Sequence, residues 1–173
     1  MPSNIEIKAR VDDLAPLRIR ALALGARSHE RLQQVDTFYR VSKGRLKLRE
    51  FGDGAGELIF YERSDRPGPK RSDYVRYPTS TPAALHVVLD AALGTRGIVE
   101  KGREVLLMGQ TRIHFDEVRG LGSFLELEVV LVPNQPAEEG EQTAQRLLSQ
   151  LEVPRNQLIS CAYIDILEEA SVR

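Results

Sequence analysis

A repeated strand pattern, apolar on one face and charged on the other, constrains the fold of this chain more than any other sequence feature. In residues 4–11, Ile5 and Ile7 alternate with Glu6 and Lys8, and a period of two residues predicts a β-strand. Pairs of like charges two residues apart recur in later strands, at Lys47/Arg49, Lys101/Arg103 and Glu126/Glu128. Because neighbouring like charges repel each other, these pairs favour a counter-charge between them.

Two interpretations of the charged faces remain open at this level. An antiparallel sheet with one face in water gives the same pattern on any single strand. The recurrence of same-sign pairs favours instead a ligand that supplies the counter-charge, such as a polyphosphate with a divalent metal ion. The strands would then close into a barrel with the charges inside, and helices would cover the apolar outer faces. Periodicity permits this arrangement but does not establish it.

The predicted elements alternate hairpins with a few helices. Strands are expected at residues 4–11, 33–41, 45–51, 57–63, around 74–77, 98–108, 111–117 and 122–132. Helices are expected from the caps Asp12 and Asp13 to Gly25, from Thr81 and Pro82 to Gly94, and over residues 137–151 and 160–168. The sequence therefore predicts an α+β fold, a closed eight-stranded antiparallel β-barrel with flanking helices, as a single domain over residues 1–173.

Composition excludes several other classes. The 24 basic and 25 acidic residues give a net charge of -1, so no overall basic field attracts nucleic acid, and no nucleic-acid partner is expected. No stretch approaches the roughly 20 apolar residues of a membrane span, so no membrane partner is expected. The single Cys161 excludes an internal disulfide and fits a reducing, cytoplasmic location. His29, His86 and His114 lack zinc-ligand spacing, although His114 shares a face with Asp116 and could donate to phosphate or be structural.

A series of short segments follows in a characteristic order. Residues 4–8 (NIEIK) come first, followed by 34–39 (QVDTFY), 44–50 (GRLKLRE), 58–63 (LIFYER), 99–103 (VEKGR), 112–118 (RIHFDEV), 121–128 (LGSFLELE) and 163–165 (YID). Over roughly residues 4–167, the sequence resembles the CYTH domain, or triphosphate tunnel metalloenzyme family, which is named after class IV adenylyl cyclases and thiamine triphosphatases. The first segment resembles the family's E-x-E-x-K signature, with Asn4 in place of its first glutamate.

The resemblance implies a role for each matching residue. Triphosphate-binding residues would be Lys8, Lys47, Arg49, Arg63, Arg76, Lys101 and Arg103. Ligands of Mg²⁺ or Mn²⁺ would be Glu6, Asp116, Glu126 and Glu128. Catalytic residues would be Glu6, Lys8, Lys101 and Asp116. Asn4 is neutral and a weaker metal ligand than a carboxylate, so we expect either weaker metal binding than the full signature would give or tight binding of one ion only.

Three functions follow as expectations from this resemblance. The first is a class IV adenylyl cyclase-like enzyme that converts ATP into cyclic AMP and pyrophosphate. The second is an inorganic tripolyphosphatase or thiamine triphosphatase, because both chemistries rest on positioning and charge neutralisation. The third is a non-catalytic module that binds a nucleotide or polyphosphate, an option suggested by Asn4. The resemblance also suggests a homodimer.

Overall fold

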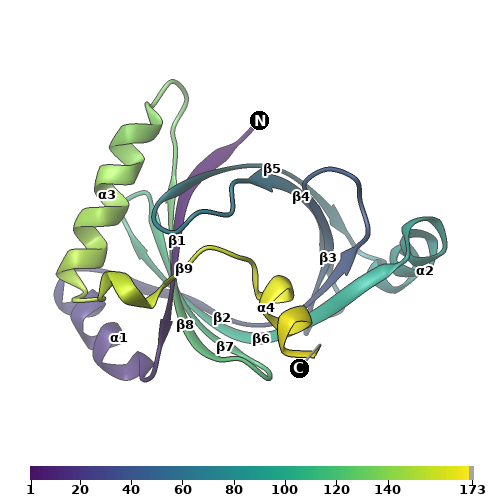
Figure 1. Ribbon diagram of the computed structural model, residues 1–173, viewed down its shortest axis with the longest axis horizontal. Coiled ribbons are helices and arrows are strands. Elements are labelled where there is room, and N and C mark those ends of the chain that lie inside the picture. Colours follow the sequence, from purple (N-terminus) through teal and green to yellow (C-terminus); the bar gives the residue numbers. More distant parts are fainter. Residues whose placement is uncertain (172–173) are drawn as a thin grey trace.

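The computed structural model describes residues 1–171, and its main feature is one antiparallel sheet rolled into a closed barrel (Figure 1). The barrel strands are β1 (Ser3–Val11), β2 (Arg27–Tyr39), β3 (Arg45–Phe51), β4 (Gly56–Arg63), β5 (Lys70–Thr79), β6 (Thr95–Met108), β7 (Thr111–Val118) and β8 (Gly122–Val130). They follow one another around the barrel in the order β5-β4-β3-β2-β6-β7-β8-β1, and pairing of β1 with β5 closes the ring. The predicted eight-stranded barrel is confirmed.

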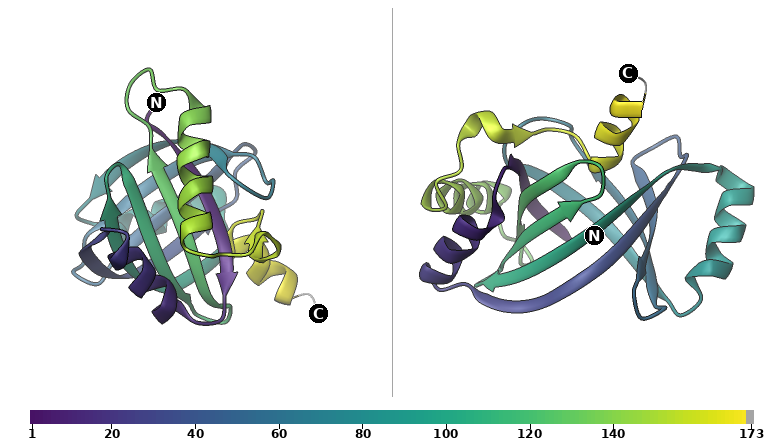
Figure 2. Two further views of the ribbon diagram at one scale, coloured as in Figure 1. Left: turned by 90° about the vertical axis from the view of Figure 1, so that its left-hand side faces the viewer. Right: turned by 90° about the horizontal axis from the view of Figure 1, so that it is seen from below.

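Helices and a short ninth strand complete the chain on the outside and at one end of the barrel. They are α1 (Leu14–Ala23), α2 (Pro82–Leu93), α3 (Ala137–Gln150), a 3₁₀ turn (Arg155–Gln157), β9 (Leu158–Ile159) and α4 (Tyr163–Ser171). Helices α1 and α3 lie side by side against the strands, whereas α2 projects from the far side of the barrel (Figures 1 and 2). Among residues 1–171, no helix combines the length and apolar character needed to cross a membrane.

The main hydrophobic core lies between the outer face of the barrel and helices α1 and α3. Ile5, Ile7 and Ala9 on β1 point outward and pack with Leu17 of α1 and Leu147 of α3. Burial of such side chains stabilises the fold by about 1.5–3 kcal/mol each. The apolar faces that the sequence predicts therefore lie outside the barrel, which leaves the charged faces inside.

One glycine allows α3 to lie close to the barrel. A Cβ added to Gly140 would lie 2.6 Å from a side-chain carbon of Ile5 and 2.7 Å from one of Leu131. Any larger residue would push α3 away from β1 and open the core.

Two helix starts show which capping predictions hold. The side chain of Asp13 accepts a hydrogen bond from the backbone N–H of Ala15, as expected for an N-cap. Helix α2 begins at Pro82 as predicted, but the Thr81 side chain makes no capping hydrogen bond. Proline at the first position, whose φ is already helical and whose missing N–H costs nothing there, supports this start.

Some predicted boundaries differ from the structure because long-range pairing extends the strands. Strand β2 begins at Arg27 rather than residue 33, since its exposed first half pairs with β6 as far as Leu107. Strand β5 begins at Lys70, where it pairs with β1 to close the barrel. The last helix begins at Tyr163 rather than residue 160. Residues 158–159, which lie outside every predicted element, form β9 on β1, a pairing that carries no local sequence signal.

Candidate active site inside the barrel

The interior of the barrel is a polar cavity of about 780 Å³. This volume is typical of small-molecule sites, which span about 300–1,000 Å³. Side chains from all eight barrel strands line it. The predicted site residues among them are Glu6, Lys8, Lys47, Arg49, Arg63, Arg76, Lys101, Arg103, Glu126 and Glu128. All predicted site residues except Asp116 therefore line the same cavity.

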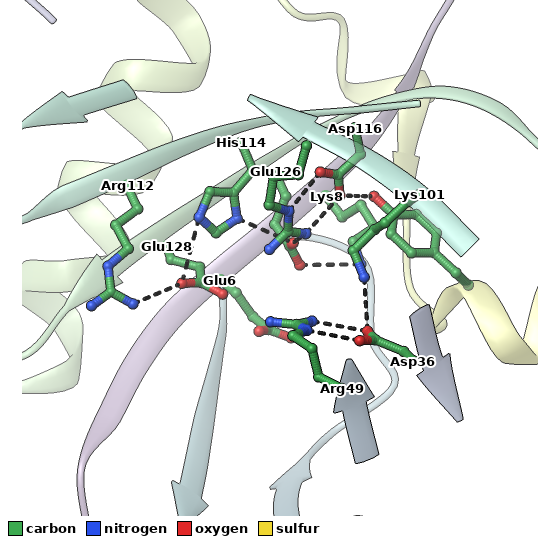
Figure 3. Close-up of polar contacts among 12 residues, drawn as sticks. Glu6, Lys8, Asp36, Arg49, Lys101, Arg112, His114, Asp116, Glu126 and Glu128 are labelled. Atoms are coloured by element: carbon green, nitrogen blue, oxygen red, sulfur yellow. Dashed lines mark hydrogen bonds and ion pairs between the residues drawn. The ribbon is translucent and has the colours of Figure 1, made fainter. Parts of the chain in front are cut away.

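The acidic wall of this cavity consists of Glu6 on β1, His114 on β7, and Glu126 and Glu128 on β8. Strand register places Glu6 opposite Glu128 and His114 opposite Glu126. His114 Nδ1 lies 3.4 Å from Glu126 Oε2, and His114 Nε2 lies 3.9 Å from Glu128 Oε2 (Figure 3). One ligand atom from each of these three residues lies within 4.8 Å of the others. Two carboxylates and an imidazole at this separation suit a divalent cation.

Asn4 continues the acidic wall along β1 and is also buried. Its Oδ1 atom has no hydrogen-bond partner among the described residues, and a buried oxygen without a partner is costly. Burial raises the pKa of Glu6; Arg63, which bonds to it, opposes this rise, and the nearby Glu126 adds to it. A hard cation would stabilise both groups, because it would give the Asn4 oxygen a partner and would favour the charged form of Glu6. The residues present thus fit a metal ion of the Mg²⁺ or Mn²⁺ type.

The basic wall of the cavity consists of Lys47 and Arg49 on β3 and Lys101 on β6, all bound to Asp36 of β2. Asp36 accepts bonds of 2.9 Å from Lys47 Nζ, 2.7 Å from Arg49 Nε and 2.7 Å from Lys101 Nζ. Burial works to raise the pKa of Asp36, but Arg49, Lys101 and Lys47 together hold it well below its usual value. One carboxylate therefore holds three cations in place, and the wall keeps an excess of positive charge.

Burial also acts on the cations of the basic wall. It lowers the pKa of Lys101 to about 7, with Arg49 and Lys47 adding to the effect and Asp36 opposing it. Burial likewise lowers the pKa of Lys47. An ammonium group in this environment gains strongly from an added anion, because the anion removes the repulsion that destabilises its charged form.

Arg103 connects the acidic wall to Asp116, deeper in the protein. Its guanidinium donates 2.6 Å bonds to both oxygens of Asp116 and a 2.8 Å bond to Glu126 Oε2. Tyr163 of α4 donates a further 2.8 Å bond to Asp116 Oδ2. Asp116 is fully buried and is not among the residues that line the cavity. Asp116 therefore bonds to Arg103 without lining the cavity, whereas the other predicted metal ligands, Glu6, Glu126 and Glu128, line it.

Comparison with known proteins identifies the family. A family model described as the CYTH domain matches residues 3–163. The chain belongs to the CYTH domain family. A search of curated proteins finds no match to it.

Solved structures with the same CYTH fold cover nearly the whole chain. The PH1012 protein from Pyrococcus horikoshii OT3 is 21% identical, with a TM-score of 0.82, over 94% of this chain and 98% of that chain. A candidate adenylate cyclase from Vibrio parahaemolyticus is 18% identical, with a TM-score of 0.78, over 95% and 97%. HpAC1 from Hippeastrum, a candidate adenylyl cyclase reported to have a dominant triphosphatase activity, is 14% identical, with a TM-score of 0.66, over 96% of each chain.

Two of the arginines that the CYTH resemblance assigns to phosphate lie at different depths. Arg63 on β4 has a side chain only 2% exposed and binds Glu6. Arg76 on β5 has a side chain 48% exposed, lies at the rim of the cavity, and comes within 3.6 Å of Glu57. The first is positioned inside the barrel, whereas the second can reach only the part of a ligand that lies near solvent.

Several buried polar residues in and near the cavity have no single role predicted from the sequence. Asp36 and Tyr163 appear only within motifs, and His114 is expected either to donate to phosphate or to be structural. Lys70 lies outside the strand predicted around residues 74–77, yet it is fully buried in β5. Their alternation with neighbouring apolar residues could have marked Asp36 and His114 as inward-facing, but the partners of Tyr163 and Lys70 depend on tertiary contacts.

Proposed function

We propose that this protein is a metal-dependent enzyme that acts on a triphosphate bound inside the barrel. The observation that carries the proposal is the division of one cavity into a basic wall and an acidic wall. A triphosphate carries several negative charges on non-bridging oxygens, which guanidinium and ammonium groups bind well. The acidic wall then supplies the oxygen ligands that Mg²⁺ or Mn²⁺ needs.

The cations of the site are held in place before the ligand binds. Lys47, Arg49 and Lys101 are fixed by Asp36, and Arg103 is fixed by Asp116. A group that is already oriented loses less entropy when it binds phosphate, so binding energy is retained. We assign Asp116 to this positioning role, in place of the metal-ligand and catalytic roles expected from the sequence, because both of its oxygens are engaged by Arg103 and Tyr163.

The metal ion would be held by Glu6, Glu126 and Glu128, with Asn4 and His114 as further donors. A bound Mg²⁺ or Mn²⁺ would supply positive charge against the phosphate oxygens. In the structure, Glu126 is also bound by Lys8 Nζ at 3.1 Å and by Arg103. If phosphate oxygens bound Lys8 and Arg103 in place of Glu126, the Glu126 carboxylate would be free to bind the ion. Metal and triphosphate should therefore bind with positive coupling.

Two reactions are candidates. Class IV adenylyl cyclase-like conversion of ATP into cyclic AMP and pyrophosphate is favoured by the candidate adenylate cyclase from Vibrio parahaemolyticus, which aligns over 95% of this chain. Hydrolysis of tripolyphosphate or thiamine triphosphate is favoured by HpAC1 from Hippeastrum, with its reported triphosphatase activity. Both reactions need the same charge neutralisation around the phosphates and differ in the attacking oxygen, a ribose hydroxyl or a water.

One experiment separates these outcomes. The purified protein is incubated with ATP, tripolyphosphate or thiamine triphosphate, each with Mg²⁺ or Mn²⁺, and the products are separated by ion-exchange chromatography. Cyclic AMP with pyrophosphate identifies the cyclase, and orthophosphate release identifies the triphosphatase. Binding of all three without turnover contradicts the enzyme and identifies a binding module. Light scattering on the same sample measures whether the protein is the homodimer that the family resemblance suggests.

A further inference from the structure

One end of the barrel is filled by side chains. Four strands contribute inward-facing apolar residues to this closed end, namely Phe38, Val99, Val118 and Phe124. Ala162, Tyr163 and Ile164 at the start of α4 enter the barrel and pack against them. All seven residues are at most 6% exposed, and the rings of Phe124 and Tyr163 lie 4.8 Å apart between centroids. Phe38, Val99, Ala162 and Tyr163 form the floor of the cavity.

Specific contacts fix α4 in the barrel end. A Cβ added to Gly97 on β6 would lie 2.6 Å from Cδ1 of Ile164, so the absence of a side chain there admits α4. Asp165 accepts bonds of 2.9 Å from Arg45 on β3 and 2.7 Å from Arg96 on β6. On the opposite side, Lys70 Nζ donates a 2.6 Å bond to the backbone carbonyl of Ser160. Several partly buried polar contacts and a close-packed interface make this end a structural part of the fold rather than a mobile cover.

The other end of the cavity opens to solvent. Its rim includes His29 and Arg31 from β2, Arg76 from β5 and Arg112 from β7, with side chains 52%, 78%, 48% and 39% exposed. Within residues 1–171, the cavity is therefore accessible from one end and blocked at the other. Figure 1 shows α4 placed against the barrel end that faces the viewer.

Two ammonium groups lie at the closed end, Lys8 paired with Glu126 and Lys47 paired with Asp36. Lys8 Nζ lies 3.8 Å above the ring of Tyr163, and Lys47 Nζ lies 5.5 Å from the centre of Phe38 and 5.7 Å from that of Tyr61. The floor of the cavity thus includes two aromatic rings, Phe38 and Tyr163, each with an ammonium group near its face. A free terminal phosphate is small and carries more charge than an internal one, so it suits this place. A nucleoside there would have to displace or bury charged groups without partners.

From the closed floor and the open rim, and resting on the triphosphate function proposed above, we infer that the substrate enters from the open end with its free terminal phosphate first. Any organic substituent stays at the rim, beside residues 29–33 and 51–53. The substrates are therefore linear polyphosphates and triphosphates substituted at one end only. Triphosphates with a bulky group at both ends are excluded, because one group would have to pass through the space filled by α4.

Four ligands test this inference on the unmodified protein. Calorimetry with Ca²⁺ as a slowly reacting divalent ion compares tripolyphosphate, ATP, the γ-methyl ester of ATP and diadenosine triphosphate. The methyl ester is the matched control, because it has lost the same terminal charge as the diadenosine compound but carries only a small cap. We expect the first three to bind, and diadenosine triphosphate to bind on the order of 100-fold more weakly than the methyl ester.

Each other result has a definite meaning. Binding of diadenosine triphosphate within about threefold of the methyl ester would overturn the closed-end inference while leaving the proposed function intact. If the methyl ester fails as completely as the diadenosine compound, terminal charge rather than the closed floor selects the ligand, and the inference is wrong. If neither tripolyphosphate nor ATP binds, the proposed function itself fails, and this inference fails with it.

Photo-crosslinking measures the orientation directly. ATP carrying an 8-azido group on the base is bound with Ca²⁺ and irradiated, and labelled peptides are mapped by mass spectrometry. Label is expected in residues 27–34 or 51–57, which contribute to the rim. Excess non-azido ATP should suppress it. Label in residues 160–171 would place the base at the closed end and contradict the inference.

Discussion

The basic wall and the acidic wall face the same cavity, but they balance their charges differently. On the basic wall, Asp36 binds Lys47, Arg49 and Lys101, and Glu57 comes within 3.9 Å of Arg49. On the acidic wall, each carboxylate has a cation of its own, because Lys8 and Arg103 bind Glu126, Arg63 binds Glu6, and Arg112 comes within 3.6 Å of Glu128. The basic wall therefore has more cations than carboxylates. An anion can bind there directly, whereas a metal ion must compete with the cations that already hold its ligands.

The largest effect is expected when the acidic wall loses a ligand. Glu126→Ala or Glu128→Ala should lower metal-dependent turnover by more than about 100-fold, since even residues that support metal ligands contribute 10–100-fold. Circular dichroism should show both variants folded. Glu100→Gln, an exposed carboxylate paired with Arg119 on the outer face, is the matched control and should retain full activity. Unchanged turnover in both site variants would remove the metal assignment.

Neutralising Asp36, which binds all three cations of the basic wall, should mainly lower the stability of the fold. Asp36→Asn leaves three buried cations without their counter-ion, so the free energy of unfolding should fall by about 3 kcal/mol or more. Saturating tripolyphosphate supplies the missing negative charge, and should therefore raise the melting temperature more in the variant than in the original protein. A ligand-induced increase no larger than that of the original protein would show that phosphate does not bind these cations.

Single cations of the site should contribute moderately to binding. Lys101→Ala and Arg103→Ala should each weaken tripolyphosphate binding by about 1.5–3 kcal/mol, or roughly 10–150-fold, which is the usual loss for one charge-assisted contact. Titration calorimetry measures both, with the exposed Arg119→Ala as control. Losses below about twofold at both positions would mean that neither contacts the ligand.

Asn4 provides a way to strengthen the acidic wall. If its buried Oδ1 atom faces the metal ion, Asn4→Glu should tighten Mn²⁺ binding by about tenfold in the presence of tripolyphosphate, because a carboxylate is the better ligand of a hard cation. Calorimetry with and without tripolyphosphate also measures the coupling between the two ligands. Weaker Mn²⁺ binding in the variant would place Asn4 outside the metal site.

The smallest effect concerns pH. The pKa of Lys101 is lowered from its ordinary 10.5 to about 7 in the folded protein, so between these values the unfolded chain holds a proton that the folded protein has lost. The free energy of unfolding should therefore rise with pH in this window, by up to about 1.4 kcal/mol per pH unit from this group. Urea titrations at several pH values should show a steeper rise for the original protein than for Lys101→Met. Equal slopes would show that Lys101 keeps its ordinary pKa.

Much of the fold could be predicted because its signals are local. Alternation on β1 and β8 assigned Glu6, Glu126 and Glu128 to faces opposite their apolar neighbours, and the structure preserves those faces. Helix α2 begins and ends where Pro82 and Gly94 indicate. The first half of β2 was missed because its exposed residues lack alternation and are held only by pairing with β6. Strand β9 was missed because its two residues, Leu158 and Ile159, form a strand only through pairing with β1.

The strands, their two faces and the residue types that meet in the cavity follow from the local sequence, because side-chain direction along a strand is a local property. Which face lies inside depends on long-range contacts, namely closure of β1 on β5 and packing of α1 and α3 on the outer face. The tertiary structure also separated carboxylates that look alike in the sequence. Glu126 lines the cavity, whereas Asp116 accepts hydrogen bonds from Arg103 and Tyr163 away from it. The bond from Tyr163 forms only because α4 fills the end of the barrel.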